Sequence, residues 1–146
     1  MTPIKFTKTE EYARYPTYAH ENDACMDVYA SDSHTLYSHE VMKVSTGIHI
    51  EIPNDCYAMV LPRSSMGLKG VIIPNAPGII DSSYPGTLQV ILMNLNPDKP
   101  IEIKRGDRIA QLQIFWKEEL RVFNGNLEKV DIVHAVRAGG FGSSGD

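Results

Sequence analysis

Short runs of alternating apolar and polar residues follow one another along this chain, and turn residues separate them. The clearest run lies between Val41 and Pro53, where Ile48, Ile50 and Ile52 alternate with polar side chains. An alternation with a period of two is typical of a strand with one buried face. The same pattern, broken at Pro, Gly and Asn, predicts further strands at residues 3–8, 25–29, 56–61, 101–104 and 108–116.

No run of helical length and period separates these predicted strands, which disfavours a parallel sheet with crossover helices. We therefore expect an all-β fold, an antiparallel sandwich or jelly-roll-like barrel, with one short turn or helix at residues 62–67. A chain of 146 residues is long enough for a single domain with a substantial core. We expect residues 1–136 to form the β domain and residues 137–146 to form a flexible, glycine-rich tail.

Composition narrows the function further. The formal net charge of −4 disfavours a general nucleic-acid-binding surface, so any phosphate site must be a local cluster of arginines. Only two cysteines occur, and no signal-peptide pattern opens the sequence, so we expect an intracellular protein without a disulfide framework. No apolar run approaches the roughly 18 residues needed to span a membrane.

The stretch from Asn75 to Ile91 contains the most promising chemistry. Apolar runs at residues 71–73, 79–80 and 88–92 flank a turn at Pro85 and Gly86, and together they predict a hairpin with Asp81 and Tyr84 near its tip. A carboxylate held on such a turn could orient a water molecule as a general base. The alternative is that Asp81 only caps the turn through an Asx hydrogen bond.

Two further stretches carry a charged side chain, one within a predicted strand and one directly after a predicted strand. Asp27 is an acidic residue in an apolar predicted strand, and its simplest interpretation is a surface charge on an edge strand. Arg63 and Ser64 follow the strand at residues 56–61 and could direct a guanidinium group, a hydroxyl group and backbone N–H groups at an anion. Simple helix capping is the alternative for the serine pair at residues 64–65.

The C-terminal segment combines Phe141 and Arg137 with glycines and serines. A glycine-rich segment does not order by itself, so a disordered tail is one interpretation. The other is a segment that becomes ordered when the phenyl ring stacks on a flat ligand and the guanidinium group pairs with a phosphate.

Two weaker signals point elsewhere. His34 and His39 have the spacing of half a zinc site, but a second pair of ligands is missing from the sequence at a supporting distance. An Arg-Gly-Asp sequence at residues 105–107 suggests an integrin ligand, whereas its position between predicted strands favours an ordinary hairpin turn. We expect solvent-exposed histidines and a hairpin turn.

Five stretches in order, at residues 24–28, 62–65, 78–86, 105–111 and 137–145, resemble the five motifs of the trimeric dUTP diphosphatases (dUTPases). The third, Gly-Ile-Ile-Asp-Ser-Ser-Tyr-Pro-Gly, is similar to the family pattern Gly-x-Ile-Asp-x-x-Tyr-x-Gly. The resemblance implies a jelly-roll-like subunit that hydrolyses dUTP to dUMP and diphosphate, which limits uracil in DNA and supplies dUMP for dTMP synthesis. It also implies Mg²⁺ as cofactor and a homotrimer with shared active sites.

The resemblance also implies a role for each motif residue. Asp81 would bind the deoxyribose 3′-hydroxyl and activate the attacking water, while Tyr84 would pack under the sugar and exclude a 2′-hydroxyl. Asp27 would hold Mg²⁺ through water. The base would be read by Asn75 and the backbone of Gly78 and Ile80 and would stack on Phe141, and the phosphates would be bound by Arg63, Ser64, Ser65, Gln111 and Arg137.

Two departures from the family pattern stand out. Cys25 occupies a position where the family usually has glycine, and Arg137 lies four residues before Phe141 instead of five.

We expect a cytoplasmic protein, with the nucleus or a virus-infected host cell as open alternatives. Two other functions also stay open. One is a dCTP deaminase-like enzyme, disfavoured because residues 89–92 contain no glutamate, and the other is a module that binds a regulatory protein such as a repressor.

Overall fold

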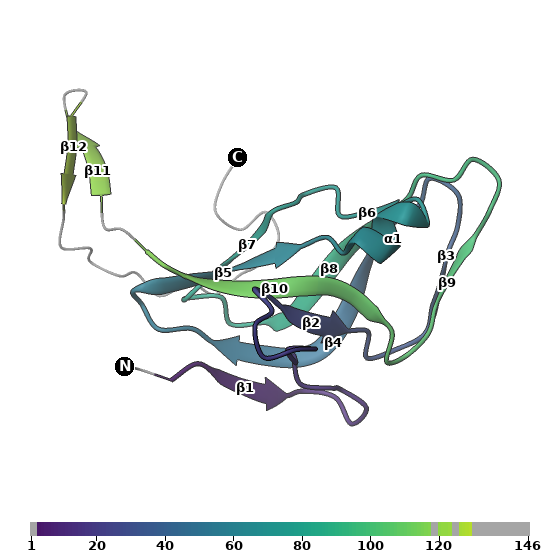
Figure 1. Cartoon of the computed structure of the whole chain (residues 1–146), viewed down its shortest axis with the longest axis horizontal. Helices are drawn as coiled ribbons and strands as arrows, with labels where there is room; N and C mark the ends of the chain where they lie inside the picture. The colour runs from purple at the N-terminus through teal and green to yellow at the C-terminus, as the bar shows by residue number, and fades with distance from the viewer. Residues whose placement is uncertain (1–2, 118–119, 124–125, 130–146) are drawn as a thin grey trace.

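Two four-stranded antiparallel sheets make up most of the molecule (Figure 1). The structure is a computed structural model, and it describes residues 3–117, 120–123 and 126–129. The first sheet has the order β1-β4-β8-β6 and the second has the order β2-β10-β5-β7, while β3-β9 and β11-β12 form two-stranded ribbons. The elements are β1 (Lys5–Lys8), β2 (Met26–Tyr29), β3 (His34–Leu36), β4 (Val41–Glu51), β5 (Cys56–Leu61), α1 (Ser64–Leu68), β6 (Val71–Ile72), β7 (Gly78–Asp81), β8 (Thr87–Asn94), β9 (Ile101–Ile103), β10 (Arg108–Trp116), β11 (Leu120–Phe123) and β12 (Asn126–Lys129).

The core lies between the two sheets, and the alternation in the sequence determines which side chains enter it. Along β5, every second residue is buried, beginning at Cys56. Along β8, the residues at positions 88, 90, 92 and 94 are buried while their neighbours are half-buried. Burying a side chain such as leucine or isoleucine stabilises the folded state by roughly 1.5–3 kcal/mol. Core residues from both sheets include Val44, Ile50, Leu88, Leu92, Val28, Val60, Ile109 and Leu112.

The predicted all-β antiparallel class is confirmed. Ile48, Ile50 and Ile52 are all buried, as the alternation between residues 41 and 53 predicts. The short helix α1 follows β5 at the predicted place. Its N-cap residue is Arg63, and no side chain caps its first turn, so the helix-capping interpretation of the serine pair is wrong. Within the described residues, no helix has the length and apolarity needed to cross a membrane.

The predicted hairpin around Asp81 is wrong. β7 pairs with β5 in one sheet, whereas β8 pairs with β4 and β6 in the other. The connection at residues 82–86 therefore crosses from one sheet to the other. Of the apolar runs leading into the turn, only the one that forms β6 pairs with β8. A strand that folds back beside its neighbour and one that crosses to the opposite sheet have the same alternation, so the sequence pattern cannot separate them.

The turn at residues 105–107 makes a similar crossing. It joins β9, which pairs with β3, to β10, which pairs with β2 and β5, so the predicted hairpin is wrong although the tight turn is present. Gly106 has a φ of 87° there, in the region that favours glycine. The guanidinium carbon of Arg105 lies 4.1 Å from the ring centroid of Tyr12. This stacking holds the turn against the N-terminal loop, unlike the free loop that an integrin ligand would present.

A hairpin around Asn124 to Asn126 is expected from the sequence, and the pairing of β11 with β12 confirms it. The proposed tail at residues 137–146, with Arg137 and Phe141, lies outside the described residues. The division of the chain into a β domain and a tail therefore stays a prediction.

Candidate functional site

Asp27 is buried although β2 is the edge strand of its sheet. The loop before β2 covers this edge, because the backbone N–H group of Asp27 donates to the carbonyl oxygen of Thr17 at 2.7 Å, and Thr17 donates back at 3.2 Å. Only 5% of Asp27 is exposed. The interpretation of Asp27 as a surface charge is therefore wrong, and a buried carboxylate needs partners.

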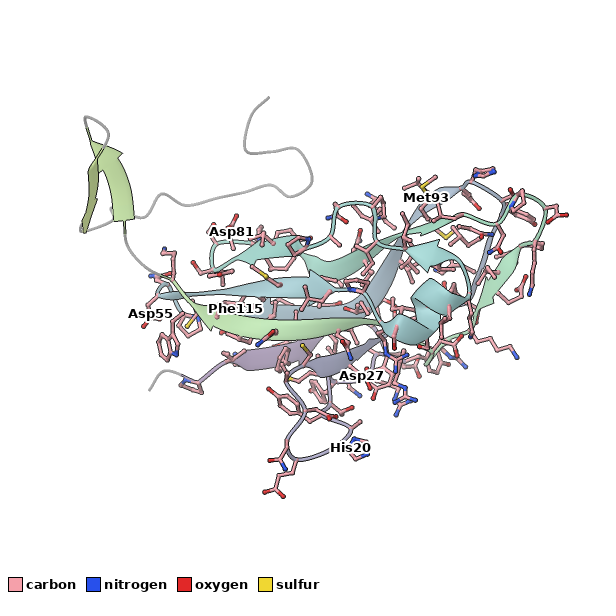
Figure 2. All side chains as sticks on the ribbon, turned by 45° about the horizontal axis from the view of Figure 1, so that its top comes forward. His20, Asp27, Asp55, Asp81, Met93 and Phe115 are labelled. Carbon is pink, nitrogen blue, oxygen red and sulfur yellow. The ribbon has the colours of Figure 1, made fainter. Side chains whose placement is uncertain are left out.

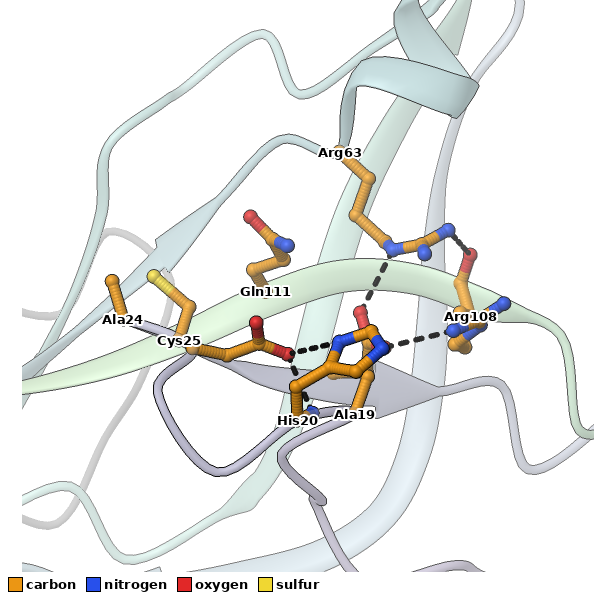
Figure 3. A pocket seen from close by; sticks show the side chains of 9 residues that line it. Ala19, His20, Ala24, Cys25, Arg63, Arg108 and Gln111 are labelled. Carbon is orange, nitrogen blue, oxygen red and sulfur yellow. Dashed lines mark hydrogen bonds and ion pairs between the residues drawn. The ribbon is translucent and has the colours of Figure 1, made fainter.

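Two arginine side chains are the partners of the Asp27 carboxylate (Figure 3). Arg63, just before α1, donates from Nε to Oδ1 of Asp27 at 2.9 Å, and Arg108 on β10 donates from Nη1 to Oδ2 at 3.2 Å. The Arg63 side chain is 17% exposed and the Arg108 side chain is 49% exposed. Arg63 also donates to the hydroxyl oxygen of Ser65 at 2.9 Å and to the backbone oxygen of Arg108 at 3.4 Å. Two guanidinium groups around one carboxylate leave a net positive charge at this place.

Arg108 is a site residue that the sequence analysis missed. It lies in the stretch 105–111, but it precedes Gln111 by three positions, and residues three apart in a regular strand face opposite sides. The β2–β10 pairing contains a register shift between Arg108 and Ala110. Such a bulge adds a residue to one strand and changes which side the next residues face. It allows Arg108 and Gln111 to line the same pocket.

The pocket has a volume of about 330 Å³. Asp27, Arg63, Arg108 and Gln111 line one part of it, and the loop residues 19, 20 and 23–25 line the rest (Figure 3). Gln111 is the cross-strand partner of Asp27. The structure thus brings together predicted residues from the first, second and fourth motif stretches, in a pocket where two guanidinium groups flank one carboxylate.

The opposite part of the pocket carries a histidine that the sequence analysis did not single out. The Nδ1 atom of His20 lies 3.4 Å from Oδ2 of Asp23, and the same carboxylate accepts the backbone N–H group of His20 at 2.8 Å. These contacts fix a tight turn before β2. The sequence indicates only a polar, proline-containing loop at residues 12–22, and no residue spacing within this loop identifies His20 as part of a pocket.

Cys25 also lines this pocket, where the family pattern usually has glycine. Its Sγ atom lies 3.6 Å from Oε1 of Gln113. Burial raises the pKa of the Cys25 thiol, so it is a neutral side chain near pH 7. The thiol occupies space beside Asp27 without adding charge to the pocket.

The donor set fits a magnesium ion that arrives with phosphates. Among the described residues, no three His, Cys, Asp or Glu side chains group closely enough to form a metal site of their own. The Asp27 carboxylate has accepting capacity for about four hydrogen bonds, of which the two arginines use part. A water bound to Mg²⁺ could donate to the remainder, because Mg²⁺ usually keeps several waters and takes few protein ligands.

Asp81 is the last residue of β7, and Tyr84 lies on the crossing connection that follows it. The backbone N–H group of Tyr84 donates to the carbonyl oxygen of Asp81 at 3.0 Å, and the Tyr84 hydroxyl donates to the backbone oxygen of Thr87 at 3.0 Å. A Cβ atom at Gly86 would lie 2.7 Å from the Tyr84 hydroxyl oxygen, so a larger residue there would have to displace the phenol. The two predicted residues are therefore held together on one turn.

Asn75 and Gly78 also lie close together. A Cβ atom at Gly78 would lie 3.4 Å from Nδ2 of Asn75 and 3.4 Å from Cβ of Val60, which packs the buried glycine between them. Ile80 packs against the core, so its side chain points inward and only its backbone can face a ligand. The use of the backbone at Gly78 and Ile80 to read a base stays a prediction.

These two groups of residues are far apart in one chain. Asp27 on β2 pairs with Gln111 on β10, and Gln111 pairs with Leu61 on β5. Asp81 on β7 pairs with Tyr57, which precedes Leu61 on β5 by four residues. Three strand spacings and four residues along a strand place roughly 20 Å between Asp27 and Asp81. Figure 2 shows them on separate parts of the molecule.

Comparison with known proteins places the chain in a family. The dUTPase family model matches residues 11–145. A deoxyuridine 5′-triphosphate nucleotidohydrolase of Solibacter usitatus is 43% identical over 145 residues, which cover 97% of this chain and 95% of that protein. The corresponding protein of Corynebacterium glutamicum is 39% identical over 146 residues, which cover 99% of this chain and 96% of that protein.

Solved structures agree on the fold. A mutant dUTPase from phage phi11 of S. aureus, described with a structural Mg(II) ion, has a TM-score of 0.73 at 21% identity and covers 90% of this chain and 98% of its own. A mutant dUTPase of Staphylococcus bacteriophage 80alpha, solved with dUpNHpp, has a TM-score of 0.73 at 23% identity and covers 99% of both chains. With the family model matching nearly the whole length and relatives of about 40% identity, this chain belongs to the dUTPase family.

Proposed function

We propose that this chain hydrolyses dUTP to dUMP and diphosphate in active sites assembled from more than one copy of the chain. The observation that carries the proposal is the strand pairing, which places Asp27 and Asp81 roughly 20 Å apart. The chain contains the pocket lined by Asp27, Arg63, Arg108 and Gln111, and a separate turn that carries a carboxylate and an aromatic ring. A site that uses both groups on one nucleotide needs the pocket of one copy beside the turn of another.

The pocket would bind the phosphate chain. Arg63 and Gln111 face it, the serines at residues 64 and 65 lie at the start of α1, and Arg108 holds the buried carboxylate from the other side. Donors held in place before the reaction stabilise the charge that develops on the phosphates. Mg²⁺, bound to the phosphates and through water to Asp27, would neutralise part of that charge. Arg137 would add a further positive charge from the tail.

The turn would hold the nucleoside and the attacking water. Asp81 is exposed at the end of β7, where its carboxylate could accept a proton from water while it binds the 3′-hydroxyl. Tyr84, fixed over Gly86, would pack against the sugar and leave no room for a 2′-hydroxyl. Asn75 and the backbone at residues 78–80 would contact the uracil edge, and Phe141 would stack on the base.

The outer face of the β2-β10-β5-β7 sheet lies between the two groups and offers a surface for a second copy. Tyr57 and Phe115 stack there with ring centroids 5.4 Å apart, and Met59 pairs with Ile79, which is half exposed. A contact that joins the pocket of one copy to the turn of the next involves two different patches, and such contacts form a ring when the rotation from copy to copy closes. The family resemblance implies a ring of three.

Mixing two inactive variants tests the shared site directly. Arg63→Gln would disable the pocket and Asp81→Asn the turn, so each variant alone should be inactive. If sites are shared, denaturing the two variants together and refolding them at equal amounts should restore about one quarter of the parent activity, since about one pair in four joins an intact pocket to an intact turn. Refolded parent protein provides the reference. No recovery from a well-folded mixture of about three times the 16.3 kDa chain mass would contradict the proposal.

Product identification separates the remaining functions. The strand β8 carries Gln, Val, Ile and Leu at residues 89–92, where a dCTP deaminase-like enzyme would have its catalytic glutamate, and none of these side chains is a general base. Incubation with each dNTP and Mg²⁺ should yield dUMP and diphosphate from dUTP. Ammonia from dCTP would instead indicate a deaminase. Tight dUTP binding without turnover would favour a module that binds a regulatory protein, a second role that stays a proposal together with the cytoplasmic location.

A further inference from the structure

The turn that carries Asp81 and Tyr84 is attached to the opposite sheet by one side chain. His49 lies on β4, between Thr7 on β1 and Thr87 on β8. Its Nδ1 atom lies 3.0 Å from the backbone oxygen of Gly86. A carbonyl oxygen only accepts hydrogen bonds, so Nδ1 carries the hydrogen and donates it. His49 belongs to none of the five motif stretches, and the sequence analysis treated it only as a polar residue in an alternating strand.

A bulge in β4 places this side chain. The β4–β8 register shifts between Ser45 and His49. Gly47 has a φ of 64° inside the shift, and the hydroxyl group of the fully buried Thr46 donates to the backbone oxygen of Leu88 at 2.7 Å. After the bulge, His49 lies opposite the first residue of β8, and its ring extends past the end of the strand to Gly86. The half-buried ring is therefore held by strands on both sides.

The contact leads directly to the predicted sugar-binding residues. Gly86 is the residue against which the Tyr84 phenol packs, since a Cβ atom there would lie 2.7 Å from the hydroxyl oxygen. The phenol hydroxyl bonds to the backbone of Thr87, and the Tyr84 N–H group bonds to the backbone of Asp81. A shift of the Gly86 carbonyl group would move the surface under the Tyr84 ring and loosen the turn that contains Asp81.

We propose that His49 is a positioning residue that fixes the Tyr84 ring and Asp81 through the Gly86 carbonyl group, and that it thereby sharpens the discrimination between deoxyribose and ribose. The proposal rests on the roles proposed above for Tyr84 and Asp81. The physical reason is that a small displacement at a packed site loses much of the benefit of preorganised groups. His49 itself touches neither the nucleotide nor the water.

Two substitutions separate the hydrogen bond from the presence of a side chain. In His49→Asn, the amide nitrogen is attached to Cγ, as Nδ1 is in histidine, and it can still donate to Gly86. In His49→Gln, the amide nitrogen lies one bond further out and misses that position. The loss of one hydrogen bond corresponds to about a five- to tenfold effect. We expect kcat/KM for dUTP to fall about five- to tenfold in His49→Gln and by less than about twofold in His49→Asn.

Sugar selectivity is the readout that a purely structural role would not change. UTP should become a stronger competitive inhibitor of dUTP hydrolysis, relative to the KM for dUTP, in His49→Gln but not in His49→Asn. Glu51→Gln is the matched control. Glu51 lies on β4, as His49 does, and its 2.9 Å ion pair with Lys5 on β1 does not involve Gly86. The Tm and oligomer mass of every variant should be measured alongside.

Three outcomes would overturn the proposal. Parent-like kcat/KM and UTP inhibition in His49→Gln would do so, as would equal losses in the glutamine and asparagine variants. A loss of activity with unchanged selectivity, matched by a fall in Tm, would assign His49 a structural role only. Asp81→Asn keeps this test apart from the proposed function: if that variant retained full activity, the proposed site itself would be wrong, whatever His49 does.

Discussion

The pocket around Asp27 and the crossing turn after β7 are built in opposite ways. In the pocket, the buried Asp27 carboxylate lies between guanidinium groups from two other parts of the chain. In the turn, backbone hydrogen bonds and a glycine hold an exposed Asp81 and a half-buried Tyr84. The ion pairs of the pocket join three parts of a single chain, and we propose that the same guanidinium groups also bind the phosphates. The carboxylate of the turn is exposed in a single chain, which suits a group whose surroundings are completed by another copy.

The largest expected effect separates the two regions by chemistry. Asp81→Asn should lower kcat for dUTP by about 10²- to 10⁴-fold, because an amide is a far weaker base than a carboxylate. The Tm should change little, since the residue is exposed at the end of β7. Steady-state kinetics and a thermal melt of the same preparation measure both. Turnover near the parent rate would leave Asp81 as a turn residue only.

Asp27→Ala should affect stability instead. Removing the carboxylate leaves the Arg63 guanidinium group, whose side chain is 17% exposed, without its ionic partner. Breaking such a pair costs about 3 kcal/mol, which lowers the Tm of a domain of this size by roughly 6–12 °C. Asp23→Ala is the control, because this carboxylate lines the same pocket but, within the described part of the chain, interacts only with His20. Equal melting temperatures for the two variants would contradict the buried role of Asp27.

Arg108→Gln should have a smaller effect, because half of this side chain is exposed and solvent weakens its attraction both to Asp27 and to a bound phosphate. We expect a loss of about 1 kcal/mol, seen as an increase of about fivefold in KM for dUTP with kcat within about twofold. Arg108→Lys should not restore the parent KM, since an ammonium group lacks the planar guanidinium geometry. An unchanged KM in both variants would show that the pocket does not need Arg108.

Alkylation of Cys25 tests the pocket with the smallest perturbation. Burial raises the pKa of this thiol above its ordinary value of 9.0, so the reactive thiolate is scarce at pH 7, and the alkylation rate should keep rising beyond pH 9. A non-hydrolysable dUTP analogue should slow the reaction further by filling the pocket. Cys56, which is buried in the core and whose pKa is also raised by burial, should react slowly with or without the analogue. Peptide mass spectrometry distinguishes the two, and an analogue that gave Cys25 no protection would place the phosphates elsewhere.

Arg108 and His49 show why part of the site could not be predicted from the sequence. Both reach their partners only because a bulge shifts the strand register, between residues 108 and 110 in one case and between 45 and 49 in the other. A bulge depends on how two strands distant in the sequence pair, and the alternation within either strand does not record it. Asp27 was recognised as unusual for the opposite reason, since an acidic residue in an apolar strand is visible without knowing its partners.

The sequence by itself determined the antiparallel all-β class, the position of the short helix and the five stretches that match the family, because alternation, turn residues and motif spacing are local properties. Only the tertiary structure decided that the connection after Asp81 crosses between sheets and that β2 is covered at its edge. It also decided that the motif residues separate into two groups roughly 20 Å apart. The physical reason is that these features depend on which strands pair across large sequence distances, and the same local pattern is compatible with several such pairings.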